Sequence, residues 1–376
     1  MKLTKLQKKY NIPISEPSIS HKEKKYVLDC IKSNWISSQG KYIKKFENYI
    51  KNFTKSKYAL AVSNGTVAIE LALKALNINK TDEVIIPDLT FAATINAVIN
   101  VGGKPVLVDV DRDTWNMNID DVKKKISAKT KFIIPVHLYG NPVDMIKLNQ
   151  VCKNKNIKII EDCAESLGAK INNKHTGSFS EIGTFSFYGN KLITTGEGGM
   201  LIFKNKSVYS RAKLIRDHGM SIKKKYYHTA VGSNYRLTNI QAAIGCAQME
   251  KIDELFFKRK INFGIYSKKL SNNKYINFQK IRKNFHSSYW LFTILVNNKN
   301  KKKILINKLR KLGVDTRPLF TPLSKMKVYK KYLKNDQEKF INSNQVSSLG
   351  FSLPSSANLT KSEVKLICRF IQKNLI

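Results

Sequence analysis

Short apolar runs alternate with longer amphipathic segments between about residues 58 and 205. The run YALAVS precedes GTVAIELALKAL, and EVIIP precedes TFAATINAVINVG. The runs PVLVDVD, FIIPVHLYG and IKIIEDCA follow. Short runs rich in β-branched residues predict buried strands, and the longer segments predict helices. Strands that alternate with helices in this way predict an α/β fold whose mainly parallel sheet is covered on both faces.

The two ends of the chain carry different patterns. Residues 20 to 52 predict two helices separated by the loop SNWISSQG. Beyond about residue 250 we expect a long helix, a strand in SSYWLFTILV, the basic helix KKKILINKLRKLG and a last helix in LTKSEVKLICRFIQKNL. We therefore expect a large domain over residues 1–250, which includes an N-terminal arm and helices within 1–55. A smaller α+β domain is expected over 251–376.

Composition narrows the class of protein. The chain has 376 residues, of which 42% are hydrophobic, so a sizeable core is expected. No window holds the roughly 18 unbroken apolar residues of a membrane helix, and the basic N-terminus lacks the apolar run of a secretory signal. We therefore expect a cytoplasmic protein without a membrane partner. The five cysteines are scattered without a CxxC pair, which argues against a disulfide framework and against a structural zinc site. We expect buried or partly buried thiols and no metal.

The formal net charge of +40 raises the question of nucleic-acid binding. The chain holds 58 lysines but only nine arginines, and proteins that read bases rely on the bidentate contacts of arginine. The lysines are also spread along the chain. These features favour solvated surfaces over a nucleic-acid partner. So positive a field still favours a polyphosphate ligand such as a nucleotide sugar.

Three loops at predicted strand ends carry candidate chemistry, because ligands of α/β sheets sit at the carboxyl ends of the strands. In the first, Asn64, Gly65 and Thr66 follow a strand and open a helix. The free backbone N–H groups and the dipole of a helix N-terminus form a seat for phosphate. A plain helix cap, for which Asn is also favoured, is the alternative.

The second loop follows the strand in IKIIED, which ends on two carboxylates. Glu161 and Asp162 stand at that end, and Glu165 lies three residues beyond. A carboxylate at the end of a buried strand must be paired, hydrogen-bonded or functional. The alternative is an aspartate cap with Glu165 completing a capping box.

The third loop holds Lys191, which follows the strand-like stretch GTFSFYG and precedes TTGEGGM. A lysine held here as a neutral amine can form a Schiff base, whereas the alternative is a surface lysine in a turn. The three loops together supply the parts of a pyridoxal 5′-phosphate (PLP) site. These are a phosphate seat, an aspartate for the pyridine nitrogen and a lysine for the aldehyde.

These motifs resemble the PLP-dependent sugar aminotransferases of the DegT/DnrJ/StrS family. The resemblance covers nearly the whole chain and is carried by VSNGTVAIELALKAL, VIIPDLTFAATINAV, PVHLYGNPVDM, IEDCAESLGA, TFSFYGNKLITTGEGGM, NYRLTNIQAAIG and DTRPLFTPL. Within the family, WISSQGKYIKKFE, SFYGNK, HSSYW and TRPLFTPL look most like the GDP-perosamine synthases. The resemblance implies fold type I, as in aspartate aminotransferase, with a seven-stranded sheet in the large domain.

The resemblance also implies roles for single residues. Lys191 matches the lysine that holds the cofactor, and Asp162 matches the partner of the pyridine nitrogen. The other implied cofactor contacts are Asn64, Gly65, Thr66 and Ser186 at the phosphate, Phe91 stacked on the ring, Glu165 near the phenolic oxygen, and Asn234 donated to the phosphate by a neighbouring subunit. The last contact implies a homodimer with shared active sites. Residues implied at the nucleotide-sugar pocket are Trp35, Ser38, Tyr188, His286 and Arg317.

Four further residues stand in the same motifs. Ser324 occupies a position where many relatives have histidine, which leaves the role of that position open. We expect Tyr289 and Trp290 to pack in the small domain, and His137 to be a hydrogen-bonded histidine at a strand end rather than a catalytic one.

The reaction implied is a ping-pong transamination. L-Glutamate would give its amino group to the cofactor, forming pyridoxamine phosphate (PMP). The acceptor would be C4 of a nucleotide-linked 4-keto-6-deoxyhexose, with GDP-4-keto-6-deoxymannose favoured, for surface-polysaccharide synthesis. UDP- or dTDP-linked sugars and amination at C3 are alternatives. A dehydratase would lack Lys191, and a nucleic-acid-binding protein on a degenerate PLP fold would have lost Lys191 or Asp162.

Overall fold

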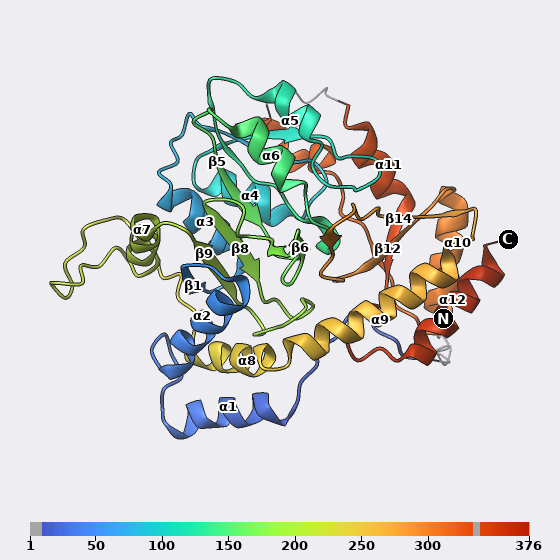
Figure 1. The fold of residues 1–376 in the computed structure, drawn as a ribbon, viewed down its shortest axis with the longest axis horizontal. Coiled ribbons are helices and arrows are strands. Elements are labelled where there is room, and N and C mark those ends of the chain that lie inside the picture. Colours follow the sequence, from blue (N-terminus) through green and yellow to red (C-terminus); the bar gives the residue numbers. More distant parts are fainter. Residues whose placement is uncertain (1–9, 334–338, 376) are drawn as a thin grey trace, which may run out of the picture.

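Seven strands form the central sheet in the computed structural model, which describes residues 10–333 and 339–375 (Figure 1). The strand order is β1-β9-β8-β5-β4-β2-β3. Only β9 runs antiparallel to its neighbours, so the mainly parallel sheet expected from the sequence is confirmed. The strands are β1 (Tyr58–Val62), β2 (Glu83–Pro87), β3 (Lys104–Val108), β4 (Thr130–Ile133), β5 (Lys158–Asp162), β8 (Ile182–Ser186) and β9 (Gly199–Phe203).

Helices cover both faces of this sheet, as Figure 1 shows. Alternate residues of one strand face opposite cores: Leu60 and Val62 of β1 pack with α3, α4 and α7, whereas Ala59 and Ala61 pack with α2 and α8. Strand residues buried on both faces produce the unbroken apolar runs of the sequence. The helices on the two faces are α3 (Gly65–Ala75), α4 (Ala92–Asn100), α7 (Lys206–Arg216), α1 (His21–Lys32), α2 (Lys41–Thr54), α5 (Ile119–Lys125), α6 (Met145–Cys152) and α8 (Asn239–Met249).

A second sheet forms the C-terminal part, in the order β10-β12-β14-β13. Its core also includes Ile12 of the N-terminal arm, which pairs with Val314. The division of the chain at residue 250 stays a prediction. The elements of this part are α9 (Ile252–Leu270), β10 (Ile276–Phe278), β12 (Phe292–Val296), α10 (Lys299–Leu312), β13 (Arg317–Pro318), α11 (Ile341–Leu349), β14 (Gly350–Leu353) and α12 (Lys361–Asn374).

The long helix expected beyond about residue 250 is α9, and it is separate from α8. Between α8 and α9, Lys251 leaves the helical conformation with φ −122°. The preceding residue, Glu250, accepts hydrogen bonds from Tyr26 of α1 and Tyr49 of α2. The remaining elements are the small sheet β11-β6-β7, with β6 (Lys170–Ile171), β7 (Lys174–His175) and β11 (Phe285–His286), and the 3-10 helices η1 (Leu138–Gly140), η2 (Leu323–Lys325) and η3 (Lys327–Tyr332).

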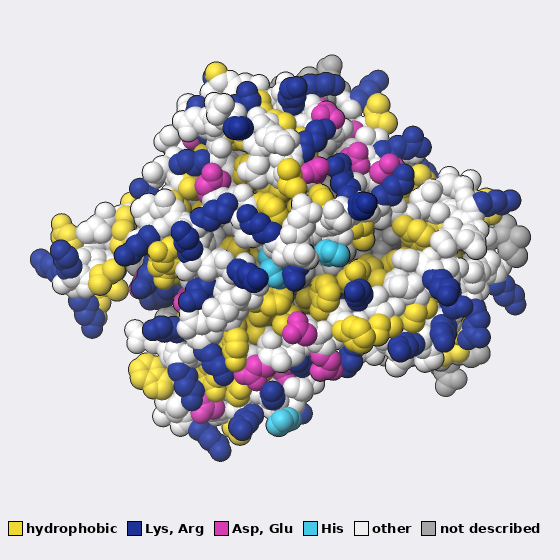
Figure 2. All heavy atoms as spheres, in the orientation of Figure 1, with side chains coloured by type: hydrophobic (Ala, Val, Ile, Leu, Met, Phe, Trp, Pro, Cys, Tyr) yellow, Lys and Arg dark blue, Asp and Glu magenta, His cyan; other side chains and the backbone are white. Residues whose placement is uncertain are grey.

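Three expectations from composition can be compared with this fold. All five cysteines are free and buried. Among the described residues, no helix is both long and apolar enough to cross a membrane; the cytoplasmic location stays a prediction. On the face drawn in Figure 2, Lys and Arg side chains are spread over the whole surface and are not gathered on one element.

Candidate active site

A cavity of about 810 Å³ opens where β1, β5 and β8 end. This is the edge of a parallel sheet at which α/β proteins bind ligands. Ten of the candidate residues line it: Asn64, Gly65, Thr66, Phe91, Asp162, Glu165, Ser186, Tyr188, Lys191 and Arg317. Residues that lie up to 253 positions apart in the sequence therefore meet in one cavity.

The floor of the cavity is the N-terminus of α3. The side chain of Asn64 caps this helix by accepting a hydrogen bond from Val67 N at 2.9 Å. The capping alternative is therefore correct for that side chain, while the neighbouring residues Gly65 and Thr66 line the cavity. A Cβ on Gly65 would lie 2.8 Å from Cβ of Ser186. The close approach of β8 to this helix leaves a small cradle next to free N–H groups, which suits a phosphate.

Asp162 lies at the end of β5 and is buried. One carboxylate oxygen accepts a hydrogen bond from Thr94 Oγ1 at 2.9 Å, and the other accepts from Ala164 N at 3.1 Å. Burial raises the pKa of Asp162, an effect that these hydrogen bonds and Lys191 oppose. A cation in front of this carboxylate would stabilise its ionised form. The arrangement suits a protonated pyridine nitrogen.

The side chain of Lys191 is largely buried, with 13% of it exposed, beside two carboxylates and an aromatic ring. Its Nζ lies 4.0 Å from Oε1 of Glu165 and 3.9 Å from the centre of the Trp290 ring. Burial lowers the pKa of Lys191, while Glu165 and Asp162 oppose that shift. Burial also raises the pKa of Glu165 to about 7. A lysine with a lowered pKa has more of the neutral amine that attacks a carbonyl carbon, so the surface-turn alternative is wrong.

Trp290 was expected only to pack in the small domain, but it also lines the cavity. Its indole N–H donates to Asn190 O at 2.9 Å, and the buried Arg259 of α9 donates to Trp290 O at 2.8 Å and to Lys191 O at 3.2 Å. Arg259 thus holds Lys191 and Trp290 together from behind. The sequence gives no sign of this contact, because Arg259 belongs to a helix far from every motif.

The other residues named from the motifs have structural partners. His137 is buried between Glu161 and Val143 N, as expected of a hydrogen-bonded histidine. Glu161 accepts hydrogen bonds from Gly177 N, Phe179 N and Ser180 N. Tyr289 packs against two phenylalanines of α9, and Ser324 N donates to the buried Asp88.

Four candidate residues do not line the cavity. Trp35 and Ser38 lie in the loop between α1 and α2, and His286 lies in β11. Asn234 is exposed and accepts a hydrogen bond from Arg236 Nε at 2.9 Å. Their roles, and the roles of the individual cavity residues, stay predictions.

Comparison with known proteins decides between the possible uses of such a cavity. The DegT/DnrJ/EryC1/StrS aminotransferase family matches residues 17–372. The chain belongs to this family. GDP-perosamine synthase of Escherichia coli O157:H7 is 42% identical over 363 residues, which cover 96% of this chain and 98% of that protein.

Two solved structures share the fold of this family member. Spr1654 of Streptococcus pneumoniae in its PMP form is 28% identical, with a TM-score of 0.91 over 97% of this chain and 98% of that one. The E. coli GDP-4-keto-6-deoxy-D-mannose-3-dehydratase with bound hydrated PLP is 26% identical, with a TM-score of 0.90 over 96% and 99% of the two chains.

The protein is therefore a PLP-dependent aminotransferase of fold type I, with PMP as the second form of its cofactor. Its cavity fits that cofactor. The cradle beside Gly65 suits the phosphate, the buried carboxylate of Asp162 suits the ring nitrogen, and the amine of Lys191 suits the aldehyde.

Proposed function

We propose that this enzyme transfers the amino group of L-glutamate to C4 of a nucleotide-linked 4-keto-6-deoxyhexose, with GDP-4-keto-6-deoxymannose as the favoured acceptor. The observation that carries the proposal is the 42% identity to a GDP-perosamine synthase along nearly the full length of both proteins. The product would be GDP-perosamine, a precursor for surface polysaccharide such as O-antigen.

The cavity residues have distinct parts in the proposed reaction. PLP supplies an electron sink for the carbon that loses its proton. Lys191 Nζ would take that proton from the amino donor and return it to the aldehyde-derived carbon of the cofactor, as general base and then general acid. In the second half-reaction Lys191 moves the proton in the opposite direction. Burial of Lys191 keeps part of it in the neutral form that this step needs.

The carboxylates of Asp162 and Glu165 face the positive charge of Lys191. The Asp162 carboxylate keeps a proton on the ring nitrogen, and its hydrogen bonds from Thr94 and Ala164 fix its orientation. The Glu165 carboxylate accepts from Tyr139 N at 2.6 Å and stays next to the amine of Lys191. Two negative charges beside one cation prevent burial from lowering the pKa of Lys191 further.

A homodimer with shared active sites is part of the proposal. Asn234 does not line the cavity of its own chain. It pairs with Asp217 at the base of the loop between α7 and α8, a loop that projects from the body in Figure 1. In this loop the side chains of Ile222 and Val231 are 93% and 98% exposed. Exposed apolar residues of this kind are typical of protein–protein contacts. A second subunit would cover them and receive Asn234.

The substrate is tested by incubating the purified holoenzyme with L-glutamate and GDP-, UDP- or dTDP-linked 4-keto-6-deoxysugars, while 2-oxoglutarate release is followed. NMR of each product locates the new amine. The proposal predicts the highest kcat/KM for the GDP sugar and an amine at C4. A preference for a UDP or dTDP sugar, or an amine at C3, would contradict the favoured acceptor. A protein without visible cofactor absorbance that binds nucleic acid would instead overturn the enzymatic reading.

A further inference from the structure

A second pocket lies at the sheet edge opposite the cavity of Lys191. Lys57 directly precedes β1, Glu181 directly precedes β8, and Lys204 directly follows β9. Because β9 runs antiparallel to both β1 and β8, these three positions lie together at the edge where β1 and β8 begin. The active-site cavity lies where the same strands end. The second pocket is therefore a separate feature of the fold.

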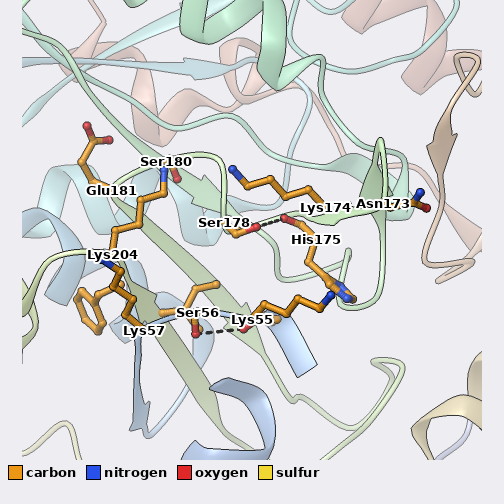
Figure 3. A pocket seen from close by; sticks show the side chains of 14 residues that line it. Lys55, Ser56, Lys57, Asn173, Lys174, His175, Ser178, Ser180, Glu181 and Lys204 are labelled. Atoms are coloured by element: carbon orange, nitrogen blue, oxygen red, sulfur yellow. Dashed lines mark hydrogen bonds between the residues drawn. The ribbon is translucent and has the colours of Figure 1, made fainter. Parts of the chain in front are cut away.

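Four lysines from three segments line this second pocket, here named the lysine pocket: Lys55, Lys57, Lys174 and Lys204 (Figure 3). Some lysines elsewhere on the surface, such as Lys22, Lys45 and Lys147, have carboxylate partners. Among the described residues, none of the four pocket lysines forms an ion pair. The one acidic lining residue, Glu181, accepts a hydrogen bond from Ile159 N at 2.9 Å. The pocket thus holds four ammonium groups against one lining carboxylate, that of Glu181, which opposes the lowering of the pKa of Lys204.

A buried histidine also lines the lysine pocket. The ring of His175 packs against Phe53 with 4.7 Å between ring centres, and within the described part of the chain its Nδ1 has no hydrogen-bond partner. Burial, together with Lys170 and Lys55, lowers the pKa of His175 to about 4, so the imidazole is neutral at pH 7. A buried polar atom without a partner is unfavourable unless a ligand or water satisfies it.

We propose that the lysine pocket binds the phosphate group of a small phosphorylated molecule. Ammonium groups form charge-assisted hydrogen bonds with phosphate oxygens, and a concave basic surface concentrates anions. Burial and Lys174 lower the pKa of Lys204. A bound anion would stabilise the charged form of this lysine and oppose that shift. The volume is about 250 Å³, below the roughly 300–1,000 Å³ of pockets for drug-sized ligands. A phosphate with few additional atoms fits that space.

Calorimetric titration of the holoenzyme with inorganic pyrophosphate at low salt tests this proposal. PLP occupies the phosphate seat of the active site in the holoenzyme. Pyrophosphate bound at the proposed nucleotide-sugar site would be the same in every variant, so the difference between the variants reports on the lysine pocket. The double variant Lys55→Gln/Lys204→Gln removes two pocket charges. The control Lys123→Gln/Lys124→Gln removes two exposed charges from α5, outside the pocket. We expect one pyrophosphate per chain, unchanged affinity in the control, and at least about tenfold weaker binding in the pocket variant.

The location is checked independently by NMR of protein labelled with ¹⁵N-histidine. Pyrophosphate should shift the ring signals of His175, identified by their absence in His175→Phe, and should leave those of His21 unchanged. Aminotransferase activity of both lysine double variants should equal that of the wild type, which shows that they are folded. The proposal is overturned if the wild type does not bind pyrophosphate, if both double variants lose affinity equally, or if the His175 signals do not move.

Discussion

The two edges of the central sheet carry lysines in opposite electrostatic settings. At the edge where the strands end, Lys191 is buried between carboxylates and the Trp290 ring. At the edge where β1 and β8 begin, four lysines share one pocket, and none has an ion-pair partner among the described residues. We therefore propose the same residue type as a single reactive amine in one place and as part of an anion-binding surface in the other.

The difference shows that neighbours, not the lysine itself, decide its chemistry. Burial lowers the pKa of Lys191 and of Lys204 alike. At Lys191 the carboxylates of Glu165 and Asp162 oppose the lowering of the pKa, so both protonation states of the amine stay accessible. At Lys204 the main neighbouring charge is another ammonium group, that of Lys174. Only the first arrangement supports repeated proton transfer.

Removing one lysine from each end of the sheet should give the largest difference in activity. Lys191→Ala should lower kcat by at least about a thousandfold, because the group that moves the substrate proton is lost. The visible absorbance of the bound cofactor should also change. Lys204→Ala should leave both properties at the wild-type level. Steady-state kinetics and absorbance spectra check both variants, and equal losses of activity would contradict the distinction.

Asp162→Asn should produce the next largest effect, a loss of about a hundredfold or more in kcat, because a charge aimed at the reacting system is removed. Burial raises the pKa of Asp162 above its unfolded value. Its ionisation therefore costs stability as pH rises through that range. The apoprotein of the Asn variant should be at least as stable as the wild type at pH 7 by thermal unfolding. A strongly destabilised apoprotein would show that Asp162 has a structural role instead.

Glu165→Gln should change the pH dependence more than the maximal rate. Glu165 has a pKa of about 7 and opposes the lowering of the pKa of Lys191. Without its charge, the pKa of Lys191 should fall, so the limb of the kcat/KM profile that depends on this amine should move to lower pH. The limb near pH 7 should disappear. Rates measured between about pH 5.5 and 9.5 check this expectation, and superimposable profiles would contradict it.

Trp290→Phe should have the smallest effect, a loss of about threefold to tenfold in kcat. The smaller ring attracts the ammonium group less, and the hydrogen bond to Asn190 O is lost. Tyr289→Phe is the matched control, because Tyr289 packs against α9 away from the cavity. Kinetics of the two variants measured side by side test this. Equal kcat values for both would show that Trp290 acts only by packing.

Much of the fold and of the cavity could be predicted from local patterns. The apolar runs predicted the buried strands. The parallel topology brings Asn64, Asp162 and Lys191 together at the carboxyl ends of these strands. The contacts of Trp290 and Arg259 with Lys191 could not be predicted, because they depend on how α9 packs against the loop after β8.

The most direct test of the account is to identify the lysine that binds the cofactor. Borohydride reduction of the holoenzyme fixes PLP to the amine that holds it, and peptide mass spectrometry then locates the modified residue. The chain has 58 lysines, so modification of one defined lysine would be very improbable by chance. We expect stoichiometric modification of Lys191. Modification of another lysine, with Lys191 unmodified, would contradict it.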